Sequence, residues 1–321
     1  MNITVIIPVR NEEGTIGELI EKLLNQSLRP AEIVICDGGS TDRTLEVISE
    51  YVNSGAPIRL ISDGAALPGR GRNLAANVAS NEWLAFIDAG TTPVTTWLES
   101  LASAAQSEDD TSIVYGSYKP VVDTFYKQCA TIAYVAPPTQ INGHLTRSRS
   151  TASLLITRSA WQAAGGFRED LRSAEDLLFF LKLDELNTCS VCAPEALVHW
   201  QVQGTPWLTF KRFIVYARSN MRAGLWRYWQ APVLTRYALL LVSALPAFWV
   251  GAKWLIVTIG LWVLMLFARA AVAVWRNRTC YPAGPITNLA RVLLLAPLIA
   301  MIDAATLHGT LMWAVKDKLD L

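Results

Sequence analysis

Residues 237–274 of this chain form a stretch in which almost no side chain is charged, and this limits the available folds more than any other feature. Only Lys253 and Arg269 carry charge, and Gly251 divides the stretch into two apolar pieces. A helix that crosses a bilayer needs about 17–25 mostly apolar residues, and each piece is near the shorter end of that range. Buried helices of a soluble domain are the alternative, but so few charges fit hydrocarbon better. We therefore expect a tight helical hairpin in a membrane.

The whole tail from Gln201 onward is basic as well as apolar. It carries 13 of the 28 Lys and Arg residues but only three of the 27 Asp and Glu residues, and nine of the 12 Trp residues lie from Trp200 onward. Trp rings collect where apolar lipid meets water. Residues 206–229 mix basic and aromatic side chains, a composition that is typical of an interfacial helix. The C-terminal part is therefore expected to associate with a membrane.

Basic residues flank the apolar hairpin. Arg236 precedes it, and Arg276 and Arg278 follow it. Because Lys and Arg are enriched in cytoplasmic loops, both ends of the hairpin should be cytosolic. A third apolar helix is expected at about residues 288–315, and the sequence KDK at 316–318 favours a cytosolic end, but the sequence leaves open whether this helix spans or re-enters. The expected location is the cell membrane, as a multi-pass protein whose N-terminal domain is cytoplasmic.

The N-terminal part alternates between short β-branched runs and segments with apolar residues at helical spacing. The expected strands are residues 3–8, 32–36, 58–61 and 83–87, and the expected helices are residues 16–24, 41–51, 73–79 and 95–105. This alternation predicts an α/β fold with a parallel, doubly wound sheet. Between residues 118 and 151 the periodicity weakens, which indicates an ordered excursion or a loop.

The five cysteines do not indicate a disulfide framework. They are scattered and odd in number in a large chain, whereas disulfide-stapled proteins are small and pair their cysteines. Cys189 and Cys192 have the spacing of half a zinc knuckle, but no second pair completes it. The N-terminus has no basic region before a long apolar run, so no signal peptide is expected.

Polar residues gather where the expected strands end. Arg10, Asn11 and Glu12 follow the first strand, Asp37 follows the second and Asp88 follows the fourth. In open α/β sheets, ligands bind outside the carboxyl ends of the strands. These positions therefore predict a shared binding site.

Five motifs in order resemble those of the family 2 glycosyltransferases of GT-A fold. They are PVRNE at 8–12, DGGSTD at 37–42, GRGRN at 69–73, FIDAG at 86–90, and GGF at 165–167 followed by ED at 175–176. The resemblance implies a Rossmann-like, mostly parallel sheet and inverting transfer of a sugar from a nucleotide-diphospho-sugar, usually with a divalent cation. We expect a glycosyltransferase domain at residues 1–204, an interfacial helix at 205–232 and membrane-anchoring helices at 233–321.

The resemblance also assigns a set of donor-binding residues. These are Pro8, Arg10, Glu12, Asp37, Arg70, Arg72 and Asp88. A carboxylate accepts hydrogen bonds from the N–H edge of a base, so Asp37 suits base recognition and Glu12 suits the neighbouring nucleoside. Alternatively, Asp37 stabilises the turn that follows it or caps the next helix. Arg70 and Arg72, in a Gly-flanked loop, would approach the diphosphate as fixed charges, or else form a solvated basic turn.

The departing diphosphate carries negative charge that a metal or fixed cations must stabilise. The Asp-x-Asp element of the family commonly holds Mg²⁺ or Mn²⁺, and here Asp88 is its first acid while Gly90 stands at its last position. One carboxylate is enough for Mg²⁺ to bind together with phosphates and waters, so we expect a metal dependence that Gly90 weakens. His199, after an expected strand at 196–198, is a second candidate ligand, and a histidine packed beside Trp200 is the alternative.

Glu175 and Asp176 open an expected helix. Carboxylates at a helix start also gain from the helix dipole, which is the structural alternative. For transfer to a hydroxyl, a general base must take the acceptor proton as the oxygen attacks the anomeric carbon. By resemblance to the Glu-Asp pair of the family, Asp176 is this base, and Glu175 would orient the acceptor or a cation such as Arg172. A lipid phosphate acceptor is already anionic and would need no strong base.

Processive members of the family carry a Gln-x-x-Arg-Trp element near the membrane interface. Here the comparable residues 203–207 read QGTPW, with Pro206 at the Arg position. Two or three apolar helices are also few for a channel that shelters a hydrated polymer. A single added sugar is therefore expected.

The combined prediction is a non-processive, inverting glycosyltransferase of cell-envelope or polysaccharide glycan biosynthesis. Its partners would be a nucleotide-diphospho-sugar, a lipid-linked or membrane-proximal acceptor and the lipid bilayer, with no nucleic acid. A polyprenyl-phosphate sugar synthase is the close alternative. A nucleotidyltransferase would need a Gly-rich loop after the first strand, where residues 8–14 contain one glycine. A non-catalytic membrane partner on a degenerate transferase fold is the third alternative, prompted by Gly90.

Overall fold

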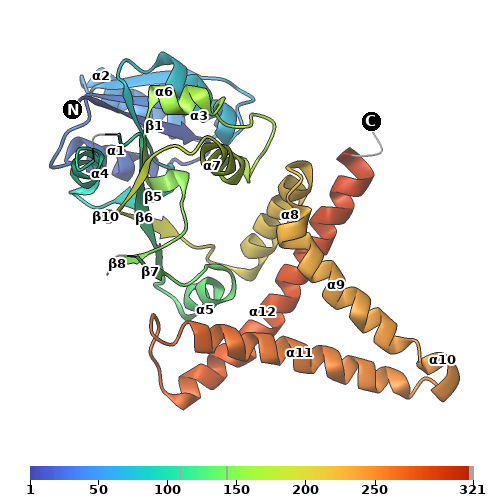
Figure 1. Cartoon of the computed structure of the whole chain (residues 1–321). Coiled ribbons are helices and arrows are strands. Elements are labelled where there is room, and N and C mark those ends of the chain that lie inside the picture. The colour runs from blue at the N-terminus through green and yellow to red at the C-terminus, as the bar shows by residue number, and fades with distance from the viewer. Residues whose placement is uncertain (109, 142–143, 318–321) are drawn as a thin grey trace. The chain divides into compact units, whose positions relative to one another are not determined.

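The computed structural model describes residues 1–317 except 109, 142 and 143. The chain divides into two compact units, and Figure 1 colours it from blue to red along its length. The first unit comprises residues 1–121 and 138–201, and the second comprises residues 122–137 together with the chain from Val202 onward. The second unit thus includes an ordered excursion from the region where the sequence periodicity weakens.

The first unit contains an eight-stranded sheet in the order β3-β2-β1-β4-β9-β6-β10-β5. Its strands are β1 (Ile3–Val9), β2 (Glu32–Asp37), β3 (Ile58–Ser62), β4 (Trp83–Phe86), β5 (Thr91–Pro93), β6 (Ile113–Val121), β9 (Leu154–Thr157) and β10 (Ser190–Gln201). Neighbouring strands are parallel except that β9 is antiparallel to β4 and β6, and β5 is antiparallel to β10. The expected mostly parallel sheet is confirmed. A separate hairpin pairs β7 (Thr139–Ile141) with β8 (His144–Thr146).

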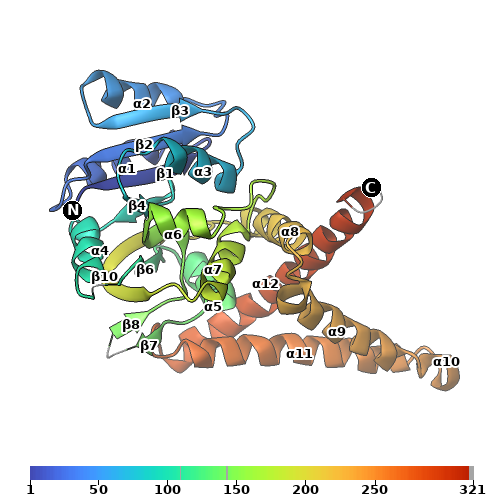
Figure 2. The same cartoon turned by 45° about the horizontal axis from the view of Figure 1, so that its top comes forward.

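Helices cover both faces of this sheet because successive strand residues point to opposite sides. They are α1 (Ile16–Leu24), α2 (Thr44–Asn53), α3 (Pro68–Val78), α4 (Trp97–Ala105), α6 (Arg158–Ala163) and α7 (Glu175–Glu185). In β1, Val5 and Ile7 belong to a buried cluster with residues of α1 and α4, whereas Ile6 belongs to a second cluster with residues of α3, α6 and α7. Figure 2 shows α3, α6 and α7 together on one side of the strands.

Helix α3 begins five residues before its expected start at residue 73, because its first residue is Pro68. Both arginines of the GRGRN motif therefore lie on a helix, and the expected Gly-flanked loop is wrong. Proline fits the first position of a helix, and the two glycines permit close packing. A Cβ at Gly69 would collide with the carbonyl oxygen of Arg168, and one at Gly71 would lie 3.3 Å from the Cβ of Pro8. The glycines thus serve helix packing rather than loop formation.

The described residues of the second unit are mainly helical. Its elements are α5 (Phe125–Tyr134), α8 (Pro206–Arg222), α9 (Trp226–Ala244), α10 (Ala247–Val250), α11 (Trp254–Arg276), α12 (Pro285–Met312) and a π-helical turn, η2 (Trp313–Asp317). The helix expected over residues 206–229 is interrupted at Gly224, whose φ of 75° suits glycine. By length and composition, three helical segments could cross a membrane: Trp226–Val250, Trp254–Arg276 and Pro285–Asp317.

Helices α9, α11 and α12 meet at a buried carboxylate. Asp303 of α12 is 1% exposed. Its oxygens pair with Arg269 of α11, whose Nη2 lies 3.1 Å away, and with Arg236 of α9 at 3.5 Å, and the Tyr237 hydroxyl donates to it at 3.3 Å. Charged groups in apolar helix bundles are usually paired. This cluster, which we call the Asp303 cluster, therefore joins three apolar helices.

Candidate active site

The residues that follow β1, β2 and β4 meet at one edge of the sheet. Strand β1 pairs in parallel with both β2 and β4, so the carboxyl ends of all three point the same way. Pro8 lies within β1 and Arg10 is exposed directly after it. Glu12 approaches the turn after β4, because a Cβ at Gly90 would lie 3.7 Å from its Oε1. Asp37 ends the neighbouring β2.

Asp37 holds the loop that follows β2. Its side chain is buried and accepts hydrogen bonds from Gly39 N at 2.9 Å, Ser40 N at 3.1 Å and Ser40 Oγ at 2.5 Å. Gly39 has a φ of 82°, and a Cβ at Gly38 would lie 2.5 Å from the carbonyl oxygen of Ala66. Both glycines are therefore required by this turn. The carboxylate shapes the loop, and its contact with a nucleotide base remains a prediction.

The loops after β1 and β2 are bonded to each other. Asn11, with a φ of 56°, donates its backbone N–H to Ser40 Oγ at 2.9 Å, and its side-chain oxygen accepts from Thr41 N at 2.8 Å. The carboxylate of Glu12 accepts from Thr15 Oγ1 at 2.6 Å. Local hydrogen bonds therefore fix the edge of the sheet before any ligand binds.

A buried arginine links two acidic parts of the site. Arg72 of α3 is 4% exposed, and its Nη1 donates to Glu175 Oε1 at 2.7 Å while its Nη2 donates to Asp88 Oδ1 at 2.7 Å. Its guanidinium also lies over the ring of Phe167, 5.4 Å from the centroid. Burial alone would lower the pKa of Arg72, but the charges of Asp88 and Glu175 raise it above its ordinary value. One cation therefore holds the turn after β4 to the start of α7.

The start of α7 carries a carboxyl group with an unusual affinity for protons. The pKa of Asp176 is raised to about 6, first by burial and then by the negative charge of Glu175, while the positive charge of Arg72 opposes both. Ala174, directly before α7, has a φ of 71°. A non-glycine residue in this conformation costs on the order of 1–3 kcal/mol, and such strain clusters at functional sites. A carboxyl group that titrates near neutral pH suits general base catalysis.

Arg72, Asp88 and Glu175 form a cluster, and two of its buried polar atoms have no hydrogen-bond partner among the described residues. They are Nε of Arg72 and Oε2 of Glu175. Buried polar atoms are nearly always hydrogen-bonded, and exceptions often belong to functional sites. The cluster therefore retains a donor and an acceptor that its own pairs do not use.

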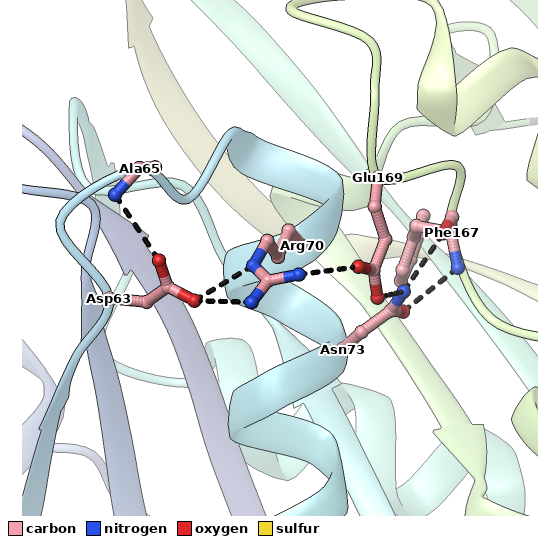
Figure 3. Close-up of polar contacts among 6 residues, drawn as sticks. All are labelled: Asp63, Ala65, Arg70, Asn73, Phe167 and Glu169. Carbon is pink, nitrogen blue, oxygen red and sulfur yellow. Dashed lines mark hydrogen bonds and ion pairs between the residues drawn. The ribbon is translucent and has the colours of Figure 1, made fainter.

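A second network ties the start of α3 to the loop before α7 (Figure 3). Arg70 donates to Asp63 through Nε at 2.8 Å and to Glu169 through Nη1 at 3.2 Å. Asn73 donates to Glu169 at 2.9 Å and to the carbonyl of Phe167 at 2.8 Å, and it accepts from Phe167 N at 2.9 Å. The charge of Arg70 is thus already balanced by two carboxylates, although its side chain is 44% exposed.

Asp88 keeps one carboxylate oxygen that no described residue bonds. Its side chain is 40% exposed, and only Oδ1 is hydrogen-bonded to another described residue. An exposed carboxylate oxygen fits Mg²⁺ or Mn²⁺, which can bind through one carboxylate, waters and substrate phosphates. Among the described residues, no group of three or more His, Cys, Asp or Glu could hold a metal, so a cation here would depend on the phosphates. His199 lies within β10, opposite Thr92 of β5, rather than after a strand.

One expected pairing at this site is wrong. Glu175 pairs with Arg72 and not with Arg172, which is exposed. The two partners are 103 residues apart, so no local spacing indicates the pair. The sequence also did not predict the hydrogen bond from Asn73 to Glu169. The only signal for it was that a polar residue, Asn73, ends the GRGRN motif.

The sequence matches the family described as Glycosyl transferase family 2 over residues 4–168, which is half of the chain. The uncharacterized glycosyltransferase EpsJ of Bacillus subtilis is 27% identical over 195 residues, covering 56% of this chain and 55% of EpsJ. The poly(ribitol-phosphate) beta-N-acetylglucosaminyltransferase TarS of Staphylococcus aureus is 28% identical over 185 residues, covering 57% of this chain and 32% of TarS. The chain thus spans about half of these relatives, or less.

Two solved structures resemble the chain in fold. The mannosyltransferase PcManGT from Pyrobaculum calidifontis, in complex with GDP-Man and Mn²⁺, has a TM-score of 0.56 and 18% identity, and the match covers 98% of this chain and 87% of that one. Residues 1–349 of S. aureus TarS, in complex with UDP-GlcNAc, have a TM-score of 0.51 and 19% identity, and the match covers 100% and 92%. At these identities the likeness shows a shared GT-A fold.

Proposed function

Because this chain belongs to glycosyl transferase family 2, we propose that it transfers a single sugar, with inversion, from a nucleotide-diphospho-sugar to a hydroxyl of a lipid-linked or membrane-proximal acceptor. The chain is a glycosyltransferase, and its donor, acceptor and stereochemistry form the proposal. The observation that carries it is the bridge in which Arg72 binds both Asp88 and Glu175, next to a carboxyl group at Asp176 that titrates at about pH 6.

The bridge suits an in-line displacement. The leaving diphosphate and the attacking hydroxyl lie on opposite sides of the anomeric carbon, so the groups that serve them must keep a fixed separation. Arg72 joins the donor-side carboxylate of Asp88 to the helix that bears Asp176, through two bonds of 2.7 Å. Its own role is therefore to position these groups, in addition to any attraction that it exerts on the diphosphate.

On the donor side, the loops after β1 and β2 would bind the nucleoside. Asp37 would accept from the base and Glu12 from the nucleoside beside it, with Pro8 and Arg10 lining the same edge. Arg70 would contact the diphosphate by exchanging one of its two carboxylate partners for phosphate oxygens.

A divalent cation at Asp88, when bound, neutralises charge that develops on the leaving diphosphate. Of the two candidate ligands, Asp88 is the stronger, because its partly exposed carboxylate lies at the sheet edge beside Glu12. His199 remains a second candidate, since it pairs in register with β5, which begins three residues after Asp88.

On the acceptor side, Asp176 would take the proton of the attacking hydroxyl. Glu175 keeps its bond to Arg72 and holds the first turn of α7 in place. The apolar hairpin and its basic flanks support an acceptor that is delivered along a membrane. Both hairpin ends would then lie on the cytoplasmic side, together with the first unit, residues 1–121 and 138–201, which we call the catalytic unit.

Transfer by the purified full chain in detergent, measured with a panel of uridine and guanosine diphosphate sugars and Mn²⁺, tests the proposal. We expect one donor to bind and to be consumed in the presence of a membrane lipid extract. Absence of binding by every donor, with or without Mn²⁺, would favour the non-catalytic alternative. An acid-labile product whose formation does not need Asp176 would identify a polyprenyl-phosphate sugar synthase instead.

The rate of transfer should depend on the protonation of Asp176. Since burial raises the pKa of this group to about 6, it is ionised and able to accept a proton above that pH. Below it, the rate at saturating donor should fall about tenfold per pH unit. A pH–rate profile with its acidic limb near 6 is the expected measurement. A limb near 4, where an ordinary Asp titrates, would contradict the assignment.

Replacing Gly90 by Asp should strengthen metal binding. A Cβ at this position meets only the carboxylate of Glu12, at 3.7 and 3.9 Å, so the side chain fits. Because affinity for such cations rises with the number of charged oxygen ligands, the Mn²⁺ concentration that gives half-maximal activity should fall about tenfold. Gly90→Ala adds the same Cβ without the carboxylate and should leave that concentration unchanged. An equal Mn²⁺ concentration for half-maximal activity in both variants would argue against a metal at Asp88.

A further inference from the structure

The third apolar helix, α12, is held by α5 and α8. These two helices follow β6 and β10, which are adjacent strands of the sheet. Val121 of β6 and Gln201 of β10 are paired in register at the ends of adjacent strands. Three residues, 122–124, lead from β6 to α5, and four residues, 202–205, lead from β10 to α8. Both helices therefore begin within a few residues of a water-soluble sheet.

Helices α5 and α8 are also bonded to each other. The hydroxyl groups of Tyr126 in α5 and Thr209 in α8 lie 2.8 Å apart, and the rings of Tyr134 and Phe213 pack edge to face at 5.2 Å. Helix α8 carries four basic side chains along its length: Lys211, Arg212, Arg218 and Arg222. A helix with this many charges does not lie in hydrocarbon, so the pair marks the level of the membrane surface.

The first part of α12 is fixed to α5. Arg291 is 3% exposed and donates from Nη2 to Gln128 Oε1 at 2.9 Å and from Nε to the same oxygen at 3.2 Å. Its Nη1 donates to the carbonyl of Tyr281 at 2.8 Å, in the connection before α12. This end of α12 therefore lies at the level of α5.

The last part of α12 is fixed to α8. A Cβ at Gly309 would collide with the carbonyl of Ile214, so the two helices touch there through their backbones. Beyond α12, Asp317 pairs with Arg218 through two bonds of 2.6 and 2.8 Å. Figures 1 and 2 both show the C-terminal part of α12 alongside α8.

We infer that α12 lies along the surface of the bilayer and does not cross it, so both of its ends are on the side of the catalytic unit. A crossing helix needs ends about 30 Å apart along the membrane normal, and that separation would carry α5 or the charged α8 into hydrocarbon. One exposed stripe of α12, including Ile286, Leu293, Ala304 and Leu311, is apolar except for His308 and faces the lipid. The hairpin of α9 to α11, with exposed Phe248 and Trp249 at its tip, is then the part that enters the membrane.

Labelling of single cysteines in sealed vesicles of both orientations tests this inference. The reporters are Cys189 in the catalytic unit, Cys280 before α12 and the Lys316→Cys variant after it, each in a chain whose other cysteines are replaced by Ser or Ala. An impermeant maleimide should label all three in the same vesicle orientation. Labelling of the Lys316→Cys variant only in the opposite orientation to Cys280 would show that α12 crosses the bilayer.

Depth measurements with spin labels give a second readout that does not use transfer activity, so a failed function proposal would leave it intact. Ala290→Cys and Ala304→Cys place labels on the exposed stripe, 14 residues or about 21 Å apart along the helix. An in-plane helix gives the two labels the same depth, and a crossing helix separates their depths by most of that distance. Labels at Ile256 and Leu264 on α11, an inserted helix, are the control pair and should differ in depth.

Discussion

Transfer by the Asp176→Asn variant should be about 100- to 10,000-fold slower than by the parent chain, the usual contribution of a general base. The amide has the same shape but cannot accept the acceptor proton. Binding of the nucleotide-sugar should change little, because the proposed donor contacts lie on the sheet edge and on α3 and not on α7. Single-turnover kinetics with labelled donor, combined with a separate donor-binding titration, measure both quantities.

Asp184→Asn is the matched control for this variant. Asp184 belongs to the same helix and pairs with Arg149 at the surface, so its loss should leave the transfer rate near that of the parent. If the Asp176→Asn variant kept more than about a tenth of the parent rate, the acceptor would not need a base of this strength. An anionic acceptor such as a lipid phosphate would then replace the hydroxyl in the proposal.

The Asp176→Asn variant should also be more stable than the parent at neutral pH. The folded-state pKa of Asp176 is raised from 3.8 to about 6, so ionisation opposes folding above pH 6. The amide does not ionise and avoids this cost. The difference in thermal midpoint should therefore shrink as the pH falls from 6 to below 3.8, where the carboxyl group is protonated in both states. A lower midpoint for the variant at pH 7 would show that the carboxylate has a structural role.

Arg72→Ala should destabilise the catalytic unit by about 3–5 kcal/mol, as expected when one partner of a buried ion pair is removed. The change leaves Glu175, which is 5% exposed, without its cation, and it also releases Asp88. Transfer should be lost as well, because the donor-side carboxylate and the helix of Asp176 are no longer joined. The temperature at which donor binding is lost, compared with the parent, reports the stability.

Two further variants test the buried ion pair between Arg72 and Glu175 separately from the rest of the site. Adding Glu175→Gln to Arg72→Ala removes the unpaired charge, so the double variant should be more stable than Arg72→Ala alone. Arg70→Ala removes an exposed arginine that also bridges two carboxylates and should cost at most about 1 kcal/mol. Equal losses for Arg70→Ala and Arg72→Ala would mean that burial of the bridge contributes nothing.

The sequence predicts the sheet and the residues at its edge because both depend on chain order. Alternating strands and helices determine a mostly parallel sheet, and such a sheet brings the ends of its strands to one edge. Glu12, Asp37 and Asp88 could therefore be assigned to one edge without coordinates. The start of α7 at Glu175 was equally accessible, since carboxylates favour the first turn of a helix.

Pairings between distant residues could not be predicted in the same way. Arg72 and Glu175 are joined across 103 residues, whereas local spacing in the sequence favours the nearer Arg172 as the partner. The sequence places the start of α3 too late, because glycine has a low helix propensity. In the folded chain, close packing at Gly69 and Gly71 outweighs that propensity. The pKa of Asp176 depends on burial and on neighbours that meet only in the folded chain.

The Asp303 cluster also has a consequence for how the chain is made. A ribosome completes Arg236 and Arg269 before Asp303, which follows Arg269 by 34 residues. During that interval the nascent hairpin holds two arginines without their carboxylate, and at the membrane surface their partners are water and lipid phosphate. Docking of α12 supplies the missing charge last. The final helix therefore replaces these temporary partners, and a chain that ends before residue 303 should hold α9 and α11 together less firmly than the full chain.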